Sequence, residues 1–161
     1  MLFSTDYDSP LGKIFIVSDG EAICGLWFYG QKHFSSSIEG DIIQDDCLAI
    51  FVEVKDWLDR YFNGEDPKIN FKLKPSGSEF RRKVWDRLLE IPYGETITYG
   101  EISREISSTM SAQAVGGAVG HNPISIIIPC HRVIGTNGKL MGYAGGLDRK
   151  RGLLKLEKIL I

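Results

Sequence analysis

A cysteine followed by a histidine and an arginine has the clearest chemical potential in this sequence. Cys130, His131 and Arg132 follow Pro129 and three consecutive isoleucines. The isoleucine run at 126–128 predicts a short buried strand, which Pro129 would end because proline has no amide hydrogen to donate. A neighbouring imidazole or cation favours the thiolate, the nucleophilic form of cysteine. Cys130 is therefore a candidate nucleophile, with a buried structural cysteine as the alternative.

Further runs of residues around this motif resemble one known family. The runs are GGAVGHNP at 116–123, PCHRV at 129–133, GYAGG at 142–146 and LLKLE at 153–157. In this order and spacing they resemble the O6-alkylguanine-DNA alkyltransferases, also called methylated-DNA–protein-cysteine methyltransferases. The resemblance is dense from about residue 78 to residue 157. It is thinner over the first 75 residues, where Ser-Pro-Leu-Gly at 9–12 carries it.

The resemblance implies DNA repair by direct reversal of damage. The methyl or other alkyl group of O6-methylguanine, and of O4-methylthymine, would pass irreversibly to Cys130, once per protein molecule. The damaged base is itself the alkyl donor, so no cofactor is expected. The sequence also lacks a glycine-rich dinucleotide motif followed by a ribose-binding acid. The implied partner is double-stranded alkylated DNA, bound through its minor groove by a monomer.

The resemblance also implies roles for groups around the thiol. The reactive cysteine is coupled through water to the next residue, here His131, and that histidine to a glutamate on the last helix, here Glu157. The histidine would take the thiol proton, while the carboxylate would orient the ring and stabilise its charge. Asn122 matches the asparagine that links the recognition helix to the backbone near the cysteine. The Val133 carbonyl and the Ala144 amide would read the guanine.

A base in duplex DNA must be flipped out of the helix before a thiol can reach it. By resemblance, Tyr99 would push the phosphate and donate a hydrogen bond to the extruded guanine; a packing aromatic is the alternative. The family places an arginine in the gap left by the base, and this chain has Gln113 there. Glutamine can hydrogen-bond the orphaned base but lacks the charge that attracts phosphate and stacks on bases. We therefore expect an effect on binding and flipping, not on the transfer chemistry.

The expected recognition helix at 112–120 is rich in alanine and glycine. Each glycine inside a helix costs about 1 kcal/mol relative to alanine, so another interaction should offset three of them. Close approach to the minor groove, which is only about 6 Å wide, is one explanation. Tight packing against another helix is the alternative. The resemblance favours the groove and makes Ala114 and Gly117 candidate DNA contacts.

The order of apolar runs and turn residues predicts an α/β protein with two domains. Residues 2–28 contain three short apolar runs separated by turn residues, which is typical of a small antiparallel sheet. Residues 46–62 carry apolar side chains at helical spacing and should cover that sheet. We expect an N-terminal α/β domain at 1–75 and a C-terminal winged-helix domain for DNA binding and alkyl transfer at 76–161. By resemblance, the first is a small ribonuclease-H-like fold.

The C-terminal half is predicted to be helical. A capping box at Thr98–Glu101 should start one helix, and Asn137-Gly138 predicts a tight hairpin that would form a wing. Two short helices joined by a turn make the helix-turn-helix pattern. The predicted elements are helices at 78–90 and 98–106, a turn at 107–110, a helix at 112–120 capped by Ser111, and a last helix at 147–160.

Composition and charge restrict the possible classes of protein. No run approaches the roughly 18 apolar residues of a membrane-spanning helix, and the N-terminus does not resemble a signal peptide. Cys24, Cys47 and Cys130 are too few and too widely spaced for a disulfide framework, which favours a reducing cytoplasm. Residues 1–76 hold 7 Lys/Arg and 13 Asp/Glu, whereas residues 77–161 hold 12 and 8. We therefore expect only the second half to meet a polyanion.

Three other interpretations stay open at this point. Cys24, His33 and Cys47 could bind zinc, but they lack CxxC or HxxxH spacing, and we predict no metal site. A damage-binding module without transfer activity would have replaced the reactive cysteine. A winged-helix transcription factor would not need Pro-Cys-His-Arg or an inward-facing Glu157. Only an alkyltransferase would gain a methyl group from methylated DNA.

Overall fold

The chain packs as two units. The structure, a computed structural model, describes residues 1–106, 109 and 111–159. One unit comprises residues 1–76 together with 123–125, and the other comprises residues 77–122 together with 126–161. The sequence analysis expected one domain boundary, at residue 75. It did not predict that residues 123–125 would pack with the first unit.

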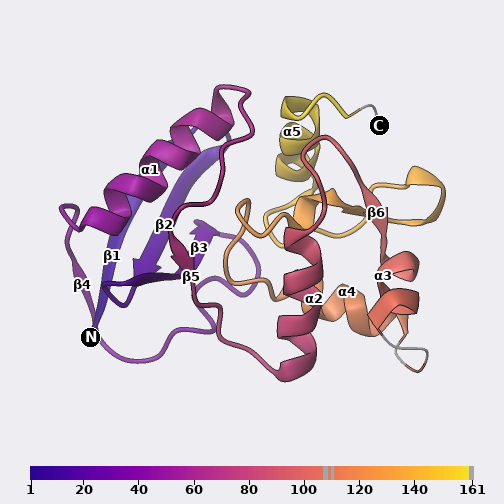
Figure 1. The fold of residues 1–161 in the computed structure, drawn as a ribbon, viewed down its shortest axis with the longest axis horizontal. Coiled ribbons are helices and arrows are strands. Elements are labelled where there is room, and N and C mark those ends of the chain that lie inside the picture. Colours follow the sequence, from indigo (N-terminus) through magenta and orange to yellow (C-terminus); the bar gives the residue numbers. More distant parts are fainter. Residues whose placement is uncertain (107–108, 110, 160–161) are drawn as a thin grey trace. The chain divides into compact units, whose positions relative to one another are not determined.

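The first unit contains a five-stranded sheet in the order β4-β1-β2-β3-β5 (Figure 1). β1 (Leu2–Ser9), β2 (Gly12–Ser18) and β3 (Ala22–Phe28) are antiparallel neighbours, as predicted. β4 (Ile42–Gln44) and β5 (Lys72–Leu73) pair in parallel with β1 and β3. Sequence analysis missed these edge strands because two or three residues show no periodicity.

Residues 123–125 complete one edge of this sheet. The Leu26 amide donates to the Pro123 carbonyl at 2.8 Å, and the Ser125 amide donates to the Leu26 carbonyl at 2.9 Å. Ile124 therefore lies beside Leu26 as a parallel bridge. β5 pairs with only the first two residues of β3, so these bonds satisfy buried backbone groups further along the strand.

α1 (Ala49–Phe62) packs against the sheet of the first unit (Figure 1). Tyr7 of β1 stacks on Phe62 and donates a hydrogen bond to Asp59 at 2.6 Å. Each large apolar side chain that the helix buries contributes roughly 1.5–3 kcal/mol. The buried residues recur at helical spacing: Ile50, Phe51, Val54, Trp57, Leu58 and Tyr61.

The second unit is largely helical (Figure 1), with α2 (Glu79–Leu89), α3 (Tyr99–Ile106), α4 (Ala112–Gly120) and α5 (Leu147–Leu156). α4 packs against both α2 and α3, and the Trp85 indole donates to the Ala118 carbonyl at 2.9 Å. The predicted turn at 107–110 lies outside the described residues, apart from Thr109. The last helix ends at Leu156 and not near residue 160, which is outside the described residues.

Side-chain caps start α3 and α4 as predicted. The Glu101 amide donates to the Thr98 hydroxyl at 3.1 Å, and the Thr98 amide donates to the Glu101 carboxylate at 3.2 Å. This reciprocal pair confirms the capping box. The Ser111 hydroxyl accepts from the Ala114 amide at 3.1 Å and caps α4. Both helix starts are therefore encoded within four residues of sequence.

The predicted strand at residues 126–128 is wrong. The three isoleucines are buried as expected, but Ile126 has a φ of 71°, in the left-handed region that a strand does not contain. The apolar run reflects burial, and periodicity alone cannot separate a buried strand from another buried segment. Cys130 instead begins a single-turn 3-10 helix, η1 (Cys130–Arg132).

The predicted turn at Asn137-Gly138 forms, but the predicted hairpin around it does not. Both residues have positive φ, at 64° and 74°, as the tightest hairpin turns require. The Gly135 amide donates to the Lys139 carbonyl at 2.8 Å. β7 (Val133–Ile134) pairs in parallel with β6 (Ile97–Thr98), and no described residue between the turn and α5 lies in a strand. The predicted wing is therefore a tight loop, held by the bond between Gly135 and Lys139 and by one from the Lys139 amide to the Thr136 carbonyl at 3.4 Å.

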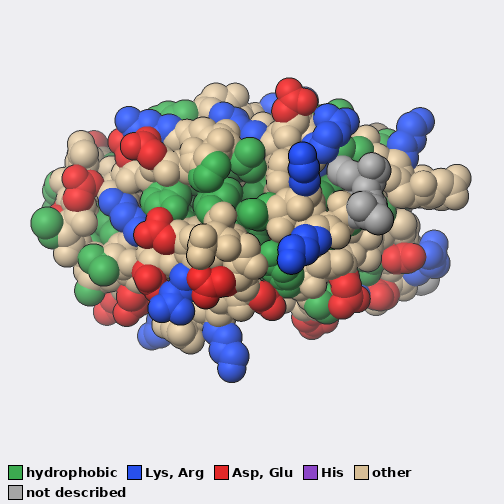
Figure 2. Space-filling model, turned by 90° about the horizontal axis from the view of Figure 1, so that it is seen from above, with side chains coloured by type: hydrophobic (Ala, Val, Ile, Leu, Met, Phe, Trp, Pro, Cys, Tyr) green, Lys and Arg blue, Asp and Glu red, His purple; other side chains and the backbone are tan. Residues whose placement is uncertain are grey.

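One face of the molecule carries charged side chains of both signs. On the face drawn in Figure 2, Lys and Arg side chains lie among Asp and Glu side chains and do not merge into one basic area.

Candidate active site

The residues with predicted catalytic roles come from two short segments of the second unit. Cys130, His131 and Arg132 form η1, and Glu157 ends α5. All four side chains are buried, with exposed fractions of 9% or less. η1 and α5 are packed against each other, which brings residues about 26 positions apart into one cluster.

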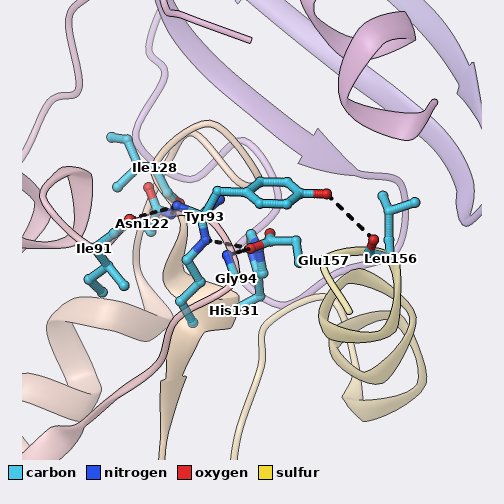
Figure 3. A network of polar contacts seen from close by, with 9 residues as sticks. Ile91, Tyr93, Gly94, Asn122, Ile128, His131, Leu156 and Glu157 are labelled. Carbon is cyan, nitrogen blue, oxygen red and sulfur yellow. Dashed lines mark hydrogen bonds and ion pairs between the residues drawn. The ribbon is translucent and has the colours of Figure 1, made fainter. Parts of the chain in front are cut away.

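The Glu157 carboxylate accepts hydrogen bonds from three directions (Figure 3). His131 Nε2 lies 2.6 Å from Oε2, and Arg132 Nε donates to Oε1 at 2.8 Å. The Gly94 amide also donates to Oε1, at 3.0 Å. A buried carboxylate is costly unless it is paired and hydrogen-bonded, and these three donors meet that condition. The predicted contact between His131 and Glu157 is present.

Sequence analysis assigned Arg132 no specific contact, yet it connects several segments of the site. Its Nη1 donates to the Ile91 carbonyl at 2.8 Å, and its guanidinium lies 5.7 Å from the centre of the Tyr93 ring. The Tyr93 hydroxyl in turn donates to the Leu156 carbonyl at 3.5 Å (Figure 3). Arg132 thus holds the loop after α2 and the end of α5 around Glu157. Its place beside Cys130, the candidate nucleophile, was the only sequence signal.

The His131 ring is neutral at neutral pH. Burial lowers the pKa of His131, and the positive charges of Arg132 and Lys150 lower it further, while the Glu157 carboxylate raises it. Because Glu157 is ionised against Arg132, the nitrogen that faces it, Nε2, carries the hydrogen and donates. Nδ1 is then the basic nitrogen of the ring. His131 is therefore in the protonation state that a general base needs.

Cys130 is a protonated thiol in the resting protein. Burial raises the pKa of the Cys130 thiol. Four weaker influences lower this pKa: hydrogen bonding to Asn122, the charge of Lys150, hydrogen bonding to the cysteine's own backbone and hydrogen bonding to Tyr143. The sequence analysis expected the flanking His and Arg to favour the thiolate, but the Arg132 charge is engaged by Glu157. The thiolate must therefore form by proton transfer inside the site.

Asn122 joins the end of α4 to the segment that leads to Cys130. It is buried, and its Nδ2 donates to the Ile128 carbonyl at 2.8 Å (Figure 3). The resemblance implied a link of this kind. A shift of α4 would therefore be transmitted to the backbone two residues before the cysteine.

Two residues that sequence analysis did not single out lie beside the thiol. Hydrogen bonding to Tyr143 and the charge of Lys150 both act to lower the pKa of the Cys130 thiol. Lys150 is fully buried in α5, three residues before Leu153 and four before Leu154, which are buried too. A lysine on the apolar face of a helix was the sequence signal that could have identified it. Lys150 Nζ donates to the Val133 carbonyl at 2.5 Å, which leaves that oxygen a second lone pair for a base.

A cavity of about 530 Å³ lies between α3, α4 and the segment 135–142. Tyr99 and Gln113 line it together, along with Gly116, Met141 and Gly142. Burial, and then the charge of Cys130, raise the pKa of Tyr99 to about 12, so its phenol remains a hydrogen-bond donor. Ala114, Gly117 and Ala144 do not line this cavity; Gly117 is exposed, and Ala114 and Ala144 are half-buried.

Both halves of the chain match models of one protein family. The ribonuclease-like domain of 6-O-methylguanine DNA methyltransferase matches residues 2–75, and the DNA-binding domain of the same family matches residues 79–159. The chain belongs to the 6-O-methylguanine DNA methyltransferase family. This confirms the resemblance seen in the sequence and the predicted fold class.

Relatives in this family match the chain over nearly its whole length. The methylated-DNA–protein-cysteine methyltransferase of Haemophilus influenzae is 46% identical over 98% of this chain and 87% of its own. The protein of the same name from Mycolicibacterium paratuberculosis is 55% identical over 94% and 89%. The crystal structure of Mycobacterium tuberculosis OGT in complex with DNA superimposes with a TM-score of 0.88 at 43% identity, covering 97% and 92% of the two chains.

Packing within the chain does not explain the glycines of α4, the helix in the family's DNA-binding domain. In the described part of the chain, a Cβ atom at Gly117 or Gly120 would meet no atom within 4 Å outside the backbone of its own helix, and one at Gly116 would meet only the Tyr99 ring at 3.9 Å or more. The alternative of tight packing against another helix is therefore wrong for Gly117 and Gly120. Their small surface is open for a partner outside the chain.

Two further expectations concern metals and membranes. In the described part of the chain, no three His, Cys, Asp or Glu side chains gather as metal ligands would. The zinc alternative at Cys24, His33 and Cys47 is therefore not assembled there. Among the described residues, no helix combines the length and the apolar character needed to cross a membrane.

Proposed function

We propose that this chain repairs alkylated DNA by transferring the methyl group of O6-methylguanine to Sγ of its own Cys130, once and irreversibly. The observation that carries the proposal is the buried contact between His131 and Glu157 beside a buried cysteine. The names of the relatives, methylated-DNA–protein-cysteine methyltransferase, support the same reaction. O4-methylthymine has the same oxygen-bound methyl group and is proposed as a second substrate.

The reaction balances with groups that the chain supplies. His131 takes the thiol proton, through water, and Glu157 stabilises the imidazolium that forms. The thiolate attacks the methyl carbon; the carbon–sulfur bond forms as the bond between carbon and O6 breaks, and guanine keeps that electron pair. The proton taken by His131 ends on the demethylated guanine, which stays part of the DNA strand. Tyr99, kept neutral by its raised pKa, donates a hydrogen bond to the base as charge develops.

Double-stranded DNA is the proposed partner, bound through its minor groove by a monomer. The open space over Gly117 and Gly120 supports close approach of α4 to a narrow groove. Ala114 and Gly117 are the proposed groove contacts, and Gln113 is proposed to fill the gap left by the flipped base. The Val133 carbonyl and the Ala144 amide are proposed to read that base. A reducing cytoplasm is proposed as the compartment, because it keeps Cys130 a free thiol.

Peptide mapping after reaction with methylated DNA tests the function. The protein is mixed with duplex DNA that contains one O6-methylguanine, and in parallel with O4-methylthymine DNA and unmodified DNA. We expect one methyl group on Cys130 and none on Cys24 or Cys47. The Cys130→Ala variant should gain no methyl group. Binding of DNA without any methyl gain would instead indicate a damage-binding module or a transcription factor, and a methyl on another cysteine would refute the site.

A further inference from the structure

The segment from Asn122 to Ile128 forms a loop that is closed at its ends. Asn122 Nδ2 donates to the Ile128 carbonyl at 2.8 Å (Figure 3). The Cys130 amide donates to the same carbonyl at 2.7 Å. The Ile128 oxygen therefore accepts one hydrogen bond from the residue after α4 and one from the backbone of the proposed nucleophile. A shift of this carbonyl would move Cys130 with it.

The middle of this loop is anchored to the sheet of the first unit. Two backbone hydrogen bonds join Pro123 and Ser125 to Leu26 of β3. The Ser125 hydroxyl also donates to Gln31 Oε1 at 3.4 Å. The same oxygen accepts from the Phe28 amide at 2.8 Å, which fixes the Gln31 side chain at the end of β3. Ser125 and Gln31 are both buried, where water does not compete for such contacts.

Ile126, directly after the anchored residues, has a strained backbone. Its φ of 71° lies in the left-handed region, which is a genuine outlier for a β-branched residue. Such a conformation costs free energy and persists only where the surrounding structure imposes it. The bonds of residues 123–125 fix the chain on one side of Ile126, and the bonds of the Ile128 carbonyl fix it on the other. The strain therefore serves the direction in which the chain continues, toward Cys130.

We propose that Ser125 and Gln31 are positioning residues for alkyl transfer, which hold the anchored loop in the strained conformation that places Cys130. This inference rests on the function proposed above. Neither residue lines the cavity between α3, α4 and the segment 135–142, so both act through the backbone. Loss of their contact would let Ile126 relax toward a negative φ and displace the thiol. Misplacement of reacting groups by about 1 Å can cost up to roughly a hundredfold in rate.

The alternative is that Gln31 serves only the end of β3. The Gln31 amide donates to the Phe28 carbonyl at 3.2 Å, while its side chain accepts from the Phe28 amide, so the residue closes a tight turn. That role would stabilise the fold without any effect on Cys130. Ser125 separates the two roles, because its hydroxyl contacts Gln31 but has no part in the turn.

Substitutions at the two positions separate positioning from stability. Ser125→Ala removes the hydroxyl and leaves both backbone bonds. Gln31→Met removes the acceptor with little change in length, and Gln31→Glu keeps an acceptor oxygen. The double variant Ser125→Ala/Gln31→Met tests whether the two residues act through one contact. Ser18→Ala is the matched control, because Ser18 is a buried serine of the same unit whose hydroxyl donates to the Ala22 carbonyl at 2.7 Å.

Each folded variant is compared with the wild type in three measurements. Single-turnover kinetics with free O6-benzylguanine and with O6-methylguanine duplex give the maximal rate and the half-saturating concentration. Urea unfolding gives the midpoint of the transition. Amide hydrogen exchange reports the protection of the Cys130 amide, whose bond to the Ile128 carbonyl the anchored loop maintains.

We expect Ser125→Ala and Gln31→Met each to lower the maximal rate by roughly tenfold, on duplex and free base alike, because the thiol itself is misplaced. The half-saturating concentrations should stay within about twofold, and the Cys130 amide should exchange faster than in Ser18→Ala. The double variant should lose no more than the larger single loss, since one contact can be removed only once. Gln31→Glu should restore most of the rate. Ser18→Ala should lower the urea midpoint and keep the wild-type rate.

The outcomes distinguish this inference from the proposed function. A wild-type maximal rate in Ser125→Ala would overturn the inference and leave the proposed function standing. Multiplied losses in the double variant, or an equal loss in Ser18→Ala, would also overturn it. If Gln31→Met does not fold, Ser125→Ala and Gln31→Glu decide alone. Failure of the wild-type protein to methylate Cys130 would overturn the function and, with it, any role in transfer, while amide exchange would still test the placement of the cysteine.

Discussion

At the scale of single residues, Glu157 has a proposed role in the reaction and also a role in the stability of the fold. It contacts His131, the proposed base, and also the Arg132 guanidinium and the Gly94 amide. A glutamine could still accept from one donor, but it would leave the Arg132 charge buried without its anion. A change at Glu157 should therefore affect the fold as well as the reaction.

Glu157→Gln should slow transfer by about a hundredfold or more, because the imidazolium of His131 loses its counter-charge. It should also lower the free energy of unfolding by about 3 kcal/mol, the cost of leaving a buried charge unpaired. Single-turnover rates with free O6-benzylguanine and urea unfolding measure the two effects. Glu105→Gln, which breaks an exposed pair with Arg87, is the control. A wild-type rate in folded Glu157→Gln would leave Glu157 only a structural role.

Gln113 stands where the family's arginine would be and is exposed beside the cavity. Gln113→Ala should weaken transfer from duplex DNA but spare free O6-benzylguanine, because a free base needs no flipping. Gln113→Arg should tighten duplex binding and steepen its salt dependence by about one unit of slope, since it adds one phosphate-binding cation. Titrations at several salt concentrations check this. Equal losses on duplex and free base would make Gln113 a structural residue.

At the scale of elements, the glycines of α4 lower the stability of the helix and keep its surface small. Gly116, Gly117 and Gly120 weaken the helix, and no contact within the described chain requires the latter two to lack a side chain. The helix is still held at both ends, by the Ser111 cap and by Asn122, which is bonded to Ile128. Both ends of α4 are thus held in place, and Gly117 and Gly120 add no side chain to its surface.

Gly117→Ala should make the protein more stable and less able to bind DNA. The free energy of unfolding should rise by about 1 kcal/mol, because alanine favours the helix and its Cβ meets open space. The dissociation constant for duplex should increase, since the methyl group separates α4 from the groove. Val52→Ala on α1, at an exposed position, should also stabilise the helix without affecting DNA. Unchanged duplex affinity in Gly117→Ala would contradict groove contact at this position.

At the scale of the whole molecule, burial of titratable groups links stability to pH. His131 has a pKa below its usual value of 6.5 in the folded state, because burial disfavours its charged form. In the unfolded chain the imidazole recovers its ordinary pKa. Below about pH 6.5 the unfolded chain therefore binds a proton that the folded protein does not, and protons favour unfolding.

The free energy of unfolding should fall as the pH drops below 6.5, by up to about 1.4 kcal/mol per pH unit from this group. Above pH 6.5 both states hold a neutral ring, and the contribution of His131 is complete. Urea unfolding at a series of pH values checks the slope. His131→Gln should show a shallower decline over the same range. An unchanged slope in that variant would assign the effect to other groups.

The sequence by itself determined the features that depend on near neighbours along the chain. The capping box at Thr98–Glu101, the Ser111 cap and the Asn137-Gly138 turn are encoded within a few residues and form as predicted. The antiparallel strands and α1 follow from periodicity. The order and spacing of the motifs around Cys130 identified the family, which the match over both halves confirms.

Only the tertiary structure decided what depends on distant partners and on burial. The isoleucines at 126–128 looked like a strand, but the positive φ of Ile126 rules it out. Arg132 turned out to pair with Glu157, and Lys150 to bind three carbonyls. The protonated state of the Cys130 thiol follows from its burial. Local pattern indicated that these segments are buried, but the hydrogen-bond partners of Arg132 and Lys150 lie far away in the chain and only the fold brings them together.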